Sequence, residues 1–300
     1  MRLAMQLDLL ERLQQWHNPV LDRLFLWITN IGGEDFYLLL GPLIFWCVGI
    51  NLGVRLLVML LGSFYTNAWL KDWFDTARPA AEYPERFVLS EGAKATALED
   101  DGSWSPSFPS GHAQHTLVFW AFVGLWLRQR WAWAIAGIMI LLVSFSRLYL
   151  GVHWPIDLLG GWFFGSLIVV ASIYLTPIIS NLPSKQQERL ALAVAAISLI
   201  GLLVDPGADR VKMLGFLAGS LGTLGLQQRY AQFQVQTVWW RQLIKIVLGI
   251  SIVFVLRALL KSILPETLIA DGIRYLIIGV WTTFGAPLLF RLTIAKPAAN

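Results

Sequence analysis

Cysteine and charged residues are both scarce in this chain. The 300 residues include a single cysteine, Cys47, so no disulfide can form within the chain. Only 14% of the residues are charged and 56% are apolar, and the mean hydropathy is +0.61. Too few polar side chains remain to cover a water-soluble globule. The composition therefore excludes an ordinary soluble domain and predicts an all-α, polytopic membrane protein.

Nine apolar stretches have roughly the length of a membrane-spanning helix. A helix needs about 20 residues to cross the hydrocarbon core of a bilayer. The stretches cover residues 36–50, 53–70, 111–127, 131–150, 156–177, 190–204, 211–226, 243–263 and 274–290. We therefore predict a bundle of about nine transmembrane helices. Several stretches are shorter than a full span, so a buried or re-entrant helix among them stays open.

Residues 1–35 lack a long apolar run. Asp8, Glu11 and Arg12 interrupt the first apolar residues before these reach the length of a signal-peptide core, so we expect no cleaved signal. Leucines and aromatic residues recur there at helical spacing between charges. This pattern predicts an amphipathic helix lying in the membrane interface. A first, strained transmembrane pass is the alternative.

Three short polar motifs interrupt the apolar background between residues 71 and 157. In chain order they are Lys71-x6-Arg78-Pro79, Pro109-Ser110-Gly111-His112 and Ser146-Arg147-x5-His153-x3-Asp157. Together they supply two histidines, three cations and one carboxylate. Such a set suits a phosphate group, because cations balance its charge while histidines attack or transfer protons.

The third motif predicts a nucleophile. Asp157 follows His153 by four positions, and Pro155 between them suits the first turn of a helix. A carboxylate near a helix N-terminus stays ionised and can accept the proton on one imidazole nitrogen. The other lone pair is then free to attack, which makes His153 the candidate nucleophile. A structural histidine beside a capping aspartate is the alternative interpretation of this segment by itself.

The second motif predicts an anion site at a helix start. The apolar run that follows it indicates a helix whose first backbone N–H groups point at an anion. Ser110 adds a hydroxyl, Gly111 allows close approach of the backbone, and His112 is the candidate general acid. His115, one turn later, is expected to be a packing residue rather than a contact of the substrate.

The cations and the acidic residues have different predicted roles. Lys71, Arg78 and Arg147 are expected to bind phosphate oxygens, although each alone could simply extend its charge to the membrane surface. The acidic run at 99–101 has no adjacent histidine or cysteine. We expect it to be solvated, and we expect neither a metal ion nor another cofactor.

These three motifs resemble the signature of the type 2 phosphatidic acid phosphatase superfamily, which also includes vanadium haloperoxidases and glucose-6-phosphatase. The resemblance covers residues 36–177 closely and is weak beyond them. It implies a metal-free mechanism through a phosphohistidine. His153 would attack phosphorus, Asp157 would orient it, His112 would protonate the leaving oxygen, and water would complete hydrolysis. Phosphate would be held by Lys71, Arg78, Ser110, Gly111 and Arg147.

The motifs also predict the organisation of the chain. Residues 1–177 form the predicted catalytic membrane domain, with 1–35 as its interfacial segment, and 178–300 the accessory transmembrane helices. The loop over 80–108 is expected to cover the phosphate pocket. Gly161-xxx-Gly165 and Gly215-xxx-Gly219 have the spacing of closely packed membrane helices. Packing within the chain is the preferred interpretation, and a homodimer is the alternative.

Charge distribution predicts an orientation. With nine spans, the connections opposite the motifs carry many cations and, as their one acid, Glu188. Cations are enriched on the cytoplasmic side of membrane proteins, so the motifs should face away from the cytoplasm, in a bacterial inner membrane. The net charge of +4 thus reflects orientation, and without a basic and aromatic groove pattern we expect no nucleic-acid partner.

The expected function is hydrolysis of a lipid phosphate at the membrane surface. A phosphomonoester or diphosphate such as polyprenyl diphosphate, phosphatidic acid or phosphatidylglycerol phosphate suits a polar site between apolar helices. A sugar-phosphate phosphatase of the glucose-6-phosphatase type and a lipid phosphotransferase are the alternatives. A transporter or an inactive scaffold is less favoured, because binding alone requires neither an acid nor a nucleophile.

Overall fold

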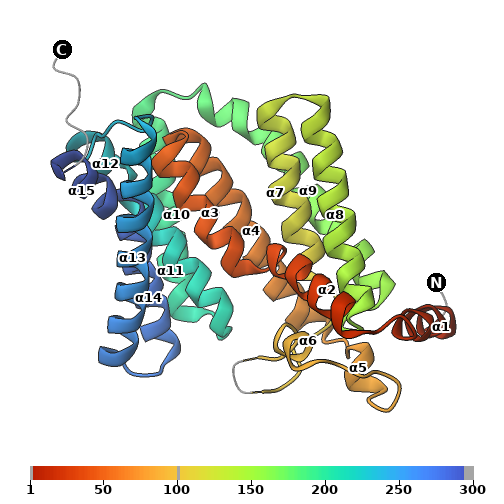
Figure 1. The fold of residues 1–300 in the computed structure, drawn as a ribbon. Helices are drawn as coiled ribbons and strands as arrows, with labels where there is room; N and C mark the ends of the chain where they lie inside the picture. The colour runs from red at the N-terminus through yellow and green to blue at the C-terminus, as the bar shows by residue number, and fades with distance from the viewer. Residues whose placement is uncertain (1–2, 100–101, 294–300) are drawn as a thin grey trace. The chain divides into compact units, whose positions relative to one another are not determined.

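The computed structural model describes residues 3–99 and 102–293, and these residues form helices joined by turns and loops (Figure 1). Within them no strand occurs, and one isolated bridge pairs Leu98 with Trp104. The chain divides into two compact units. Unit 1 comprises Met1–Tyr37 and Gly62–Ser172, and unit 2 comprises Leu38–Leu61 and Ile173–Asn300. The predicted all-α fold is confirmed.

Unit 1 begins with two helices, α1 (Leu3–Gln14) and α2 (Pro19–Ile31), where the sequence predicted one. Asn18 starts the second helix, because its side chain accepts hydrogen bonds from the backbone N–H groups of Val20 and Leu21 and Pro19 follows it. The interfacial location of this segment stays a prediction. The unit continues with the second half of α4 (Ile50–Phe74), α5 (Pro79–Glu82), α6 (Glu91–Ala95), α7 (Gly111–Leu127), α8 (Arg130–Tyr149) and most of α9 (Pro155–Ser180).

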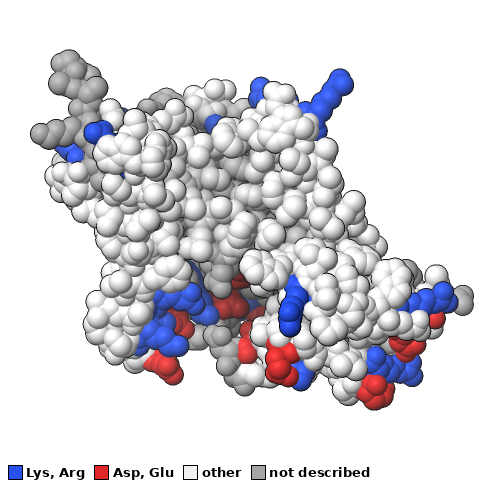
Figure 2. Space-filling view, viewed as in Figure 1, with Lys and Arg blue, Asp and Glu red and all other residues white. Residues whose placement is uncertain are grey.

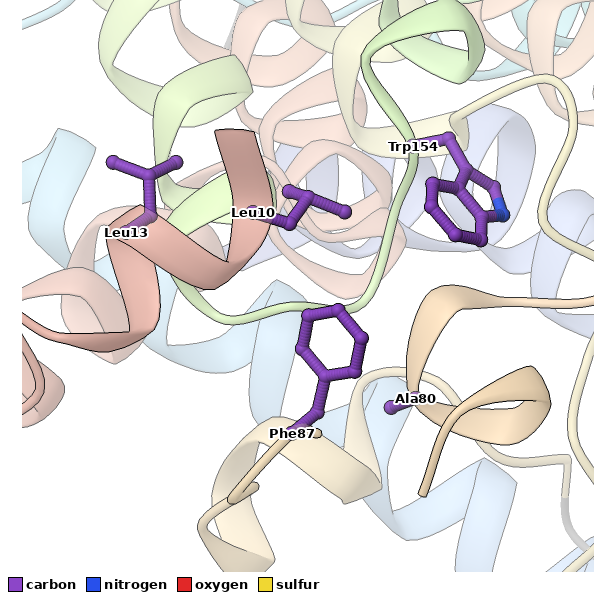
Figure 3. Close-up of a cluster of buried hydrophobic side chains, with 5 residues drawn as sticks. All are labelled: Leu10, Leu13, Ala80, Phe87 and Trp154. Carbon is purple, nitrogen blue, oxygen red and sulfur yellow. The ribbon is translucent and has the colours of Figure 1, made fainter. Parts of the chain in front are cut away.

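The core of unit 1 joins its N-terminus to the connection between α8 and α9. Leu10 and Leu13 of α1 lie buried in one cluster with Ala80, Phe87 and Trp154 (Figure 3). A second cluster gathers around the end of α8 and contains Ala93, Ala97, Tyr149, Leu150 and Val152. The helix α2 also packs against α8. Burial of these side chains therefore fixes the short segment 150–154 from several directions.

Unit 2 contains the greater part of α3 (Glu34–Cys47), the first half of α4 and the helices that follow α9. In its tightest contact, α11 packs against α14. Gly215 and Gly219 face the backbone of α14, so this spacing serves packing within the chain. The later helices are α10 (Ser184–Val204), α11 (Ala208–Gly222), α12 (Leu224–Tyr230), α13 (Trp239–Ile263), α14 (Leu268–Val280), the π-helix η1 (Trp281–Gly285) and α15 (Ala286–Thr293).

Five helices among the described residues are long and apolar enough to cross a membrane. They are α8, α9, α10, α13 and the continuous helix Leu268–Thr293. The chain is therefore a multi-pass membrane protein. The other four predicted stretches fall on α3, α4, α7 and the pair α11 and α12, which are shorter or less apolar. The count of nine spans stays a prediction.

Acidic side chains in unit 1, together with many of its basic ones, collect at one end of its long helices, while Arg128 and Arg130 lie at the opposite end of α7 and α8. In Figure 2, acidic and basic side chains gather around α1, α2, α5 and α6, whereas the visible flank of α8 is apolar over most of its length. Exposed apolar residues on that helix include Ile138, Leu141 and Leu142. An apolar flank ending in a charged region is the pattern expected where a helix leaves the hydrocarbon core.

Candidate active site

The histidine and aspartate of the third motif form a buried pair. The segment 150–154 joins α8 to α9, and Gly151, with a φ of +69°, makes the turn that this short connection requires. Pro155 begins α9, which places Asp157 in its first turn. The Nδ1 atom of His153 lies 3.1 Å from Oδ2 of Asp157. Because an ionised carboxylate only accepts, Nδ1 carries the proton and Nε2 keeps its lone pair.

Two further donors hold the Asp157 carboxylate. Its Oδ2 atom accepts the backbone N–H of Trp154 at 2.7 Å and the hydroxyl of Ser107. Sequence reasoning missed Ser107. The available signal was the alternation of serines at 103, 105 and 107 immediately before the second motif, which brings every second side chain of an extended segment to one face. With three donors, the carboxylate has a fixed orientation toward His153.

The guanidinium of Arg78 contacts the other side of the imidazole. Its Nη1 atom donates to Nε2 of His153 at 3.2 Å and to the backbone oxygen of Val152 at 2.9 Å. Its opposite edge holds Ser105, through Nε to the backbone oxygen at 2.7 Å and Nη2 to the hydroxyl at 2.6 Å. Lys71 donates to the same hydroxyl at 3.5 Å. Ser105, also missed by sequence reasoning, therefore links the two cations of the first motif.

Arg147 lies fully buried at the end of α8 and bonds neutral oxygens. Its Nη1 atom donates to the hydroxyls of Thr29 and Thr96, each at 2.9 Å, and Nη2 donates to the backbone oxygen of Thr96 at 3.1 Å. Among the described ion pairs, none includes this guanidinium. A buried cation without a carboxylate partner is costly in the free protein and attractive to an anion.

The second motif starts α7 as the sequence predicted. Ser110 caps the helix by accepting the N–H of Ala113, and its own backbone N–H donates to the backbone oxygen of Asp157 at 3.0 Å. Gly111 packs so closely that a Cβ there would lie 3.0 Å from Oδ1 of Asn67. The motif is thereby attached to α9 on one side and α4 on the other.

The two histidines of α7 occupy different surroundings. His112 is partly exposed beside Gly32 and has no hydrogen bond within the described part of the chain. His115 is buried, with Nδ1 2.9 Å from the hydroxyl of Ser63 and Nε2 3.5 Å from Oε1 of Glu34. Its ring also packs edge-on against Phe64. His112 is therefore the histidine open to a ligand, while His115 lies in the packing between α4 and α7.

A buried polar network fixes α7 on α4. Asn67 donates to the backbone oxygen of Pro109 at 3.2 Å and to Gln114 at 3.0 Å. Gln114 in turn donates to the backbone oxygen of Ser63 at 2.9 Å. On α4, the spacing of Ser63, Asn67 and Lys71 by four residues puts them on one face. The same helix face therefore holds the second motif and carries the lysine of the first.

Electrostatics at the site favour a neutral His153 imidazole. Burial, reinforced by the nearby charges of Arg78, Arg147 and Lys71, holds the pKa of His153 well below its usual 6.5. Burial also lowers the pKa of Arg78 to about 10, and this arginine remains protonated at neutral pH. The imidazole is thus unprotonated at Nε2 while a cation lies beside it, as attack on an anionic phosphorus centre requires.

The structure connects most of the predicted site residues. Lys71, Arg78, His153 and Asp157 form one chain of hydrogen bonds through Ser105 and Ser107, and Ser110 joins it through its backbone. Arg147 and His112 have no direct bond to that chain among the described contacts. The loop over 80–108 supplies Thr96, Ser105 and Ser107, and its role as a cover stays a prediction. No group of three metal-ligating side chains occurs in the described ranges.

Two family models match the sequence. The model of the PAP2 superfamily matches residues 52–179, which contain all three motifs, and the model of the PAP2 superfamily phosphatase transmembrane extension matches residues 211–297. The first match includes the helices and loops that carry the site, apart from α1, α2 and the start of α3. The second lies in unit 2.

Curated relatives include proteins from a plant, an archaeon and a bacterium. Lipid phosphate phosphatase delta of Arabidopsis thaliana is 24% identical over 75% of this chain and 56% of its own length. Undecaprenyl-diphosphatase of Sulfolobus acidocaldarius is 41% identical over 29% of this chain and 40% of its length. Phosphatidylglycerophosphatase B of Bacillus subtilis is 27% identical over 52% of this chain and 73% of its length.

The chain spans about half the length of the first two of these relatives. The resemblance inferred from the motifs is nevertheless confirmed, because one family model covers the motifs and the other covers most of the remaining chain. Residues 52–179, which carry the histidine, aspartate and arginine side chains described above, thus form a PAP2 superfamily domain, and residues 211–297 form a PAP2 transmembrane extension.

Proposed function

We propose that this protein is an integral membrane phosphatase that hydrolyses a phosphomonoester or diphosphate of a lipid. The observation that carries the proposal is the His153 imidazole, held by Asp157 at Nδ1 and directed with Nε2 at the Arg78 guanidinium. A nucleophile, its orienting carboxylate and a cation for the attacked group are thus adjacent. The PAP2 match and the phosphatase relatives support the same activity.

The charges around this pair favour a phosphate ligand. Arg78 and Arg147 are buried and bond carbonyl, hydroxyl and imidazole groups. A phosphate dianion would balance both charges. Arg147 has a buried Nε–H without an acceptor among the described residues and can offer a fork to two phosphate oxygens. The N–H groups of Arg78 bond Ser105, Pro106, Val152 and His153, so Arg78 would offer the donor that leaves His153. The start of α7 adds the backbone N–H of Gly111, while the backbone N–H of Ser110 already bonds Asp157. Lys71 would complete the set through its charge.

The mechanism we propose proceeds through a phosphohistidine. Nε2 of His153 attacks phosphorus and the bond from phosphorus to the lipid oxygen breaks, while Asp157 stabilises the imidazole as it becomes positive. His112 gives its proton to the leaving oxygen and then takes one from a water molecule. That water attacks phosphorus, the bond to Nε2 breaks, and inorganic phosphate leaves. In the free protein Nε2 accepts from Arg78, so substrate must replace this bond.

The site suits a lipid. It lies at the ends of α8 and α9, two of the helices apolar and long enough to cross a membrane. A phosphate head at the membrane surface would reach it while an apolar tail stays between helices. Polyprenyl diphosphate, phosphatidic acid and phosphatidylglycerol phosphate are the candidate classes.

We extend the proposal to a nine-span topology. Residues 1–177 would form the catalytic domain and residues 178–300 the accessory helices, with the site on the extracytoplasmic side of a bacterial inner membrane.

A phosphate-release panel tests the activity. Purified protein in detergent is offered a polyprenyl diphosphate, phosphatidic acid, phosphatidylglycerol phosphate and glucose 6-phosphate, with and without EDTA. We expect release from at least one lipid, undiminished by EDTA, and none from a His153→Ala protein. Release from glucose 6-phosphate alone would replace the lipid by a sugar phosphate. Phosphate found on a second lipid instead of in solution would make the protein a transferase, and a strict metal requirement would overturn the mechanism.

A further inference from the structure

The hydrogen bonds of Arg147 use one side of its guanidinium. Nη1 donates its two protons to the hydroxyls of Thr29 and Thr96, and Nη2 donates one proton to the backbone oxygen of Thr96. The Nε–H group is buried and has no partner within the described part of the chain. Nε–H and the second proton of Nη2 lie on the same edge of the planar group. The edge left open is therefore the two-donor fork that fits two oxygens of a phosphate.

We propose that Thr29 and Thr96 are positioning residues that aim the open edge of Arg147 at the phosphate of the substrate. The inference rests on the proposed function for the identity of that phosphate. The two threonines come from different parts of unit 1. Thr29 lies in the last turn of α2, and Thr96 directly follows α6. Arg147 is thus held between the N-terminal segment and the loop that precedes the second motif.

Threonine suits this task because its hydroxyl orients a guanidinium without cancelling its charge. A carboxylate in the same place would bond Nη1 equally well, and it would also neutralise the cation that the phosphate needs. The Thr96 hydroxyl donates its own proton to the backbone oxygen of Ala93 at 2.8 Å, so a lone pair faces Arg147. Thr29 is fully buried, which excludes water as a competing acceptor.

The N-terminal segment is attached firmly enough to hold an arginine. The Tyr149 hydroxyl, two residues after Arg147, donates to Asp22 of α2 at 2.7 Å. His17 stacks on the Tyr149 ring with centroids 4.5 Å apart, and its Nε2 atom lies 2.8 Å from the Tyr149 backbone oxygen. Residues 1–31 lie outside the matched PAP2 range of 52–179. A part of the chain beyond the family motifs would therefore help to form the phosphate site.

Paired substitutions test the role of each hydroxyl. Thr29→Val keeps the shape and removes the acceptor, and we expect kcat/KM to fall about tenfold, which corresponds to about 1.4 kcal/mol. Thr29→Ser keeps the acceptor and should stay within about twofold of wild type. Thr96→Val should lower kcat/KM less than Thr29→Val, because the Thr96 backbone oxygen still holds Nη2. Thr282→Val is the matched control, since Thr282 is equally buried but belongs to unit 2.

A double-mutant cycle separates positioning from general stability. In an Arg147→Lys background the fork is absent, so Thr29→Val should lower kcat/KM by much less than in the wild type. An equal loss in both backgrounds, or no loss in the wild type, would overturn the inference. If Thr29→Val does not fold, the same cycle with Thr96→Val decides the matter by the same criterion.

Binding of inorganic phosphate gives a readout that does not require turnover. We expect phosphate to raise the Tm of the wild type, and Thr29→Val to weaken the apparent phosphate affinity about tenfold while Thr29→Ser does not. A wild type that binds phosphate in this way but releases none from any lipid would end the proposed function and leave the inference standing. A wild type that hydrolyses lipid, with equal phosphate affinity in the valine variant, would end the inference alone.

Discussion

Buried arginines in the two units have different partners. In unit 2, Arg210 donates to both oxygens of Asp205 at 2.8 and 3.0 Å, and Arg274 pairs with Asp271. In unit 1, the hydrogen bonds described for Arg147 go to threonine oxygens. These two arginines of unit 2 are thus balanced by carboxylates within the fold. The difference indicates that unit 1 has left a positive charge for a ligand to balance.

Neutral partners alone do not make an anion site, as Lys245 of unit 2 demonstrates. This lysine is fully buried and donates to the backbone oxygens of Trp46, Gln234 and Val235. Its three protons are therefore all used, and no donor remains for a ligand. Arg147 combines a charge without a carboxylate partner with a buried Nε–H that has no acceptor among the described residues. Arg241 of unit 2 also has a buried Nε–H without an acceptor among the described residues, but that residue is only half-buried, whereas Arg147 is fully buried. Full burial together with these two conditions fits the phosphate site that we propose.

The largest expected effect is the loss of turnover on substitution of His153, compared with substitution of a buried cation that has a structural role. His153→Ala should lower kcat by about 10⁴-fold or more, because the attacking atom is lost. Lys245→Met, which removes a buried cation from unit 2, should leave kcat/KM near the wild-type value. Phosphate release by each purified variant, with circular dichroism as the check on folding, measures both. Wild-type turnover by the alanine variant would remove His153 from the mechanism.

Stability should respond in opposite directions to loss of an arginine in the two units. Arg147→Met removes a buried charge that no carboxylate balances among the described residues, so we expect a gain in stability, reduced by loss of the bonds to Thr29 and Thr96, while activity is lost. Arg210→Met removes the cation that bonds both oxygens of the half-buried Asp205 carboxylate and should destabilise the protein. Chemical denaturation in one detergent compares the two variants. Destabilisation of similar size in both would remove the distinction between the units.

Phosphate should stabilise the protein through unit 1 only. With inorganic phosphate at about 100 times its dissociation constant, we expect a gain of about 2.7 kcal/mol for the wild type. The same gain is expected for Arg229→Met, because Arg229 forms an exposed pair with Glu188 in unit 2. Arg147→Met should lose most of the gain. Thermal unfolding with phosphate and with sulfate as a second anion measures the difference, and an undiminished gain in Arg147→Met would place the anion elsewhere.

The contact between His153 and Asp157 was predictable because the motif that contains them is local. His153 and Asp157 are four residues apart, and one helix start brings them together, so their pairing could be inferred before any fold was known. Thr29 and Thr96 could not be found in this way. They meet Arg147 across separations of 118 and 51 residues, and a single threonine in an amphipathic helix carries no signal of such a contact.

The helices were predicted more reliably than their relation to the membrane. Apolar stretches place helices well, because burial in lipid or in protein requires the same side chains. For that reason α7, which is mostly buried inside unit 1, has the composition of a span although it has 17 residues. Residues 15–18 escaped prediction as a break, since the capping by Asn18 depends on one side chain rather than on periodicity.

The smallest expected effect is a shift of the acid limb of the kcat/KM pH profile to lower pH. Burial and the cations of unit 1 hold the pKa of His153 well below 6.5. The attacking imidazole therefore stays neutral as pH falls through 6.5, and kcat/KM should decline only at lower pH, where Nε2 takes a proton. The unfolded chain binds that proton near pH 6.5, so this group also makes the fold less stable as pH falls below 6.5.

The pH dependence of kcat/KM from about pH 4 to about pH 8 measures the limb. Lys71→Met removes one of the charges that lower this pKa and should move the limb toward 6.5, whereas Lys245→Met in unit 2 should not. A limb at or above pH 6.5 in the wild type would mean that substrate meets a protonated histidine, and the nucleophile would have to be sought elsewhere.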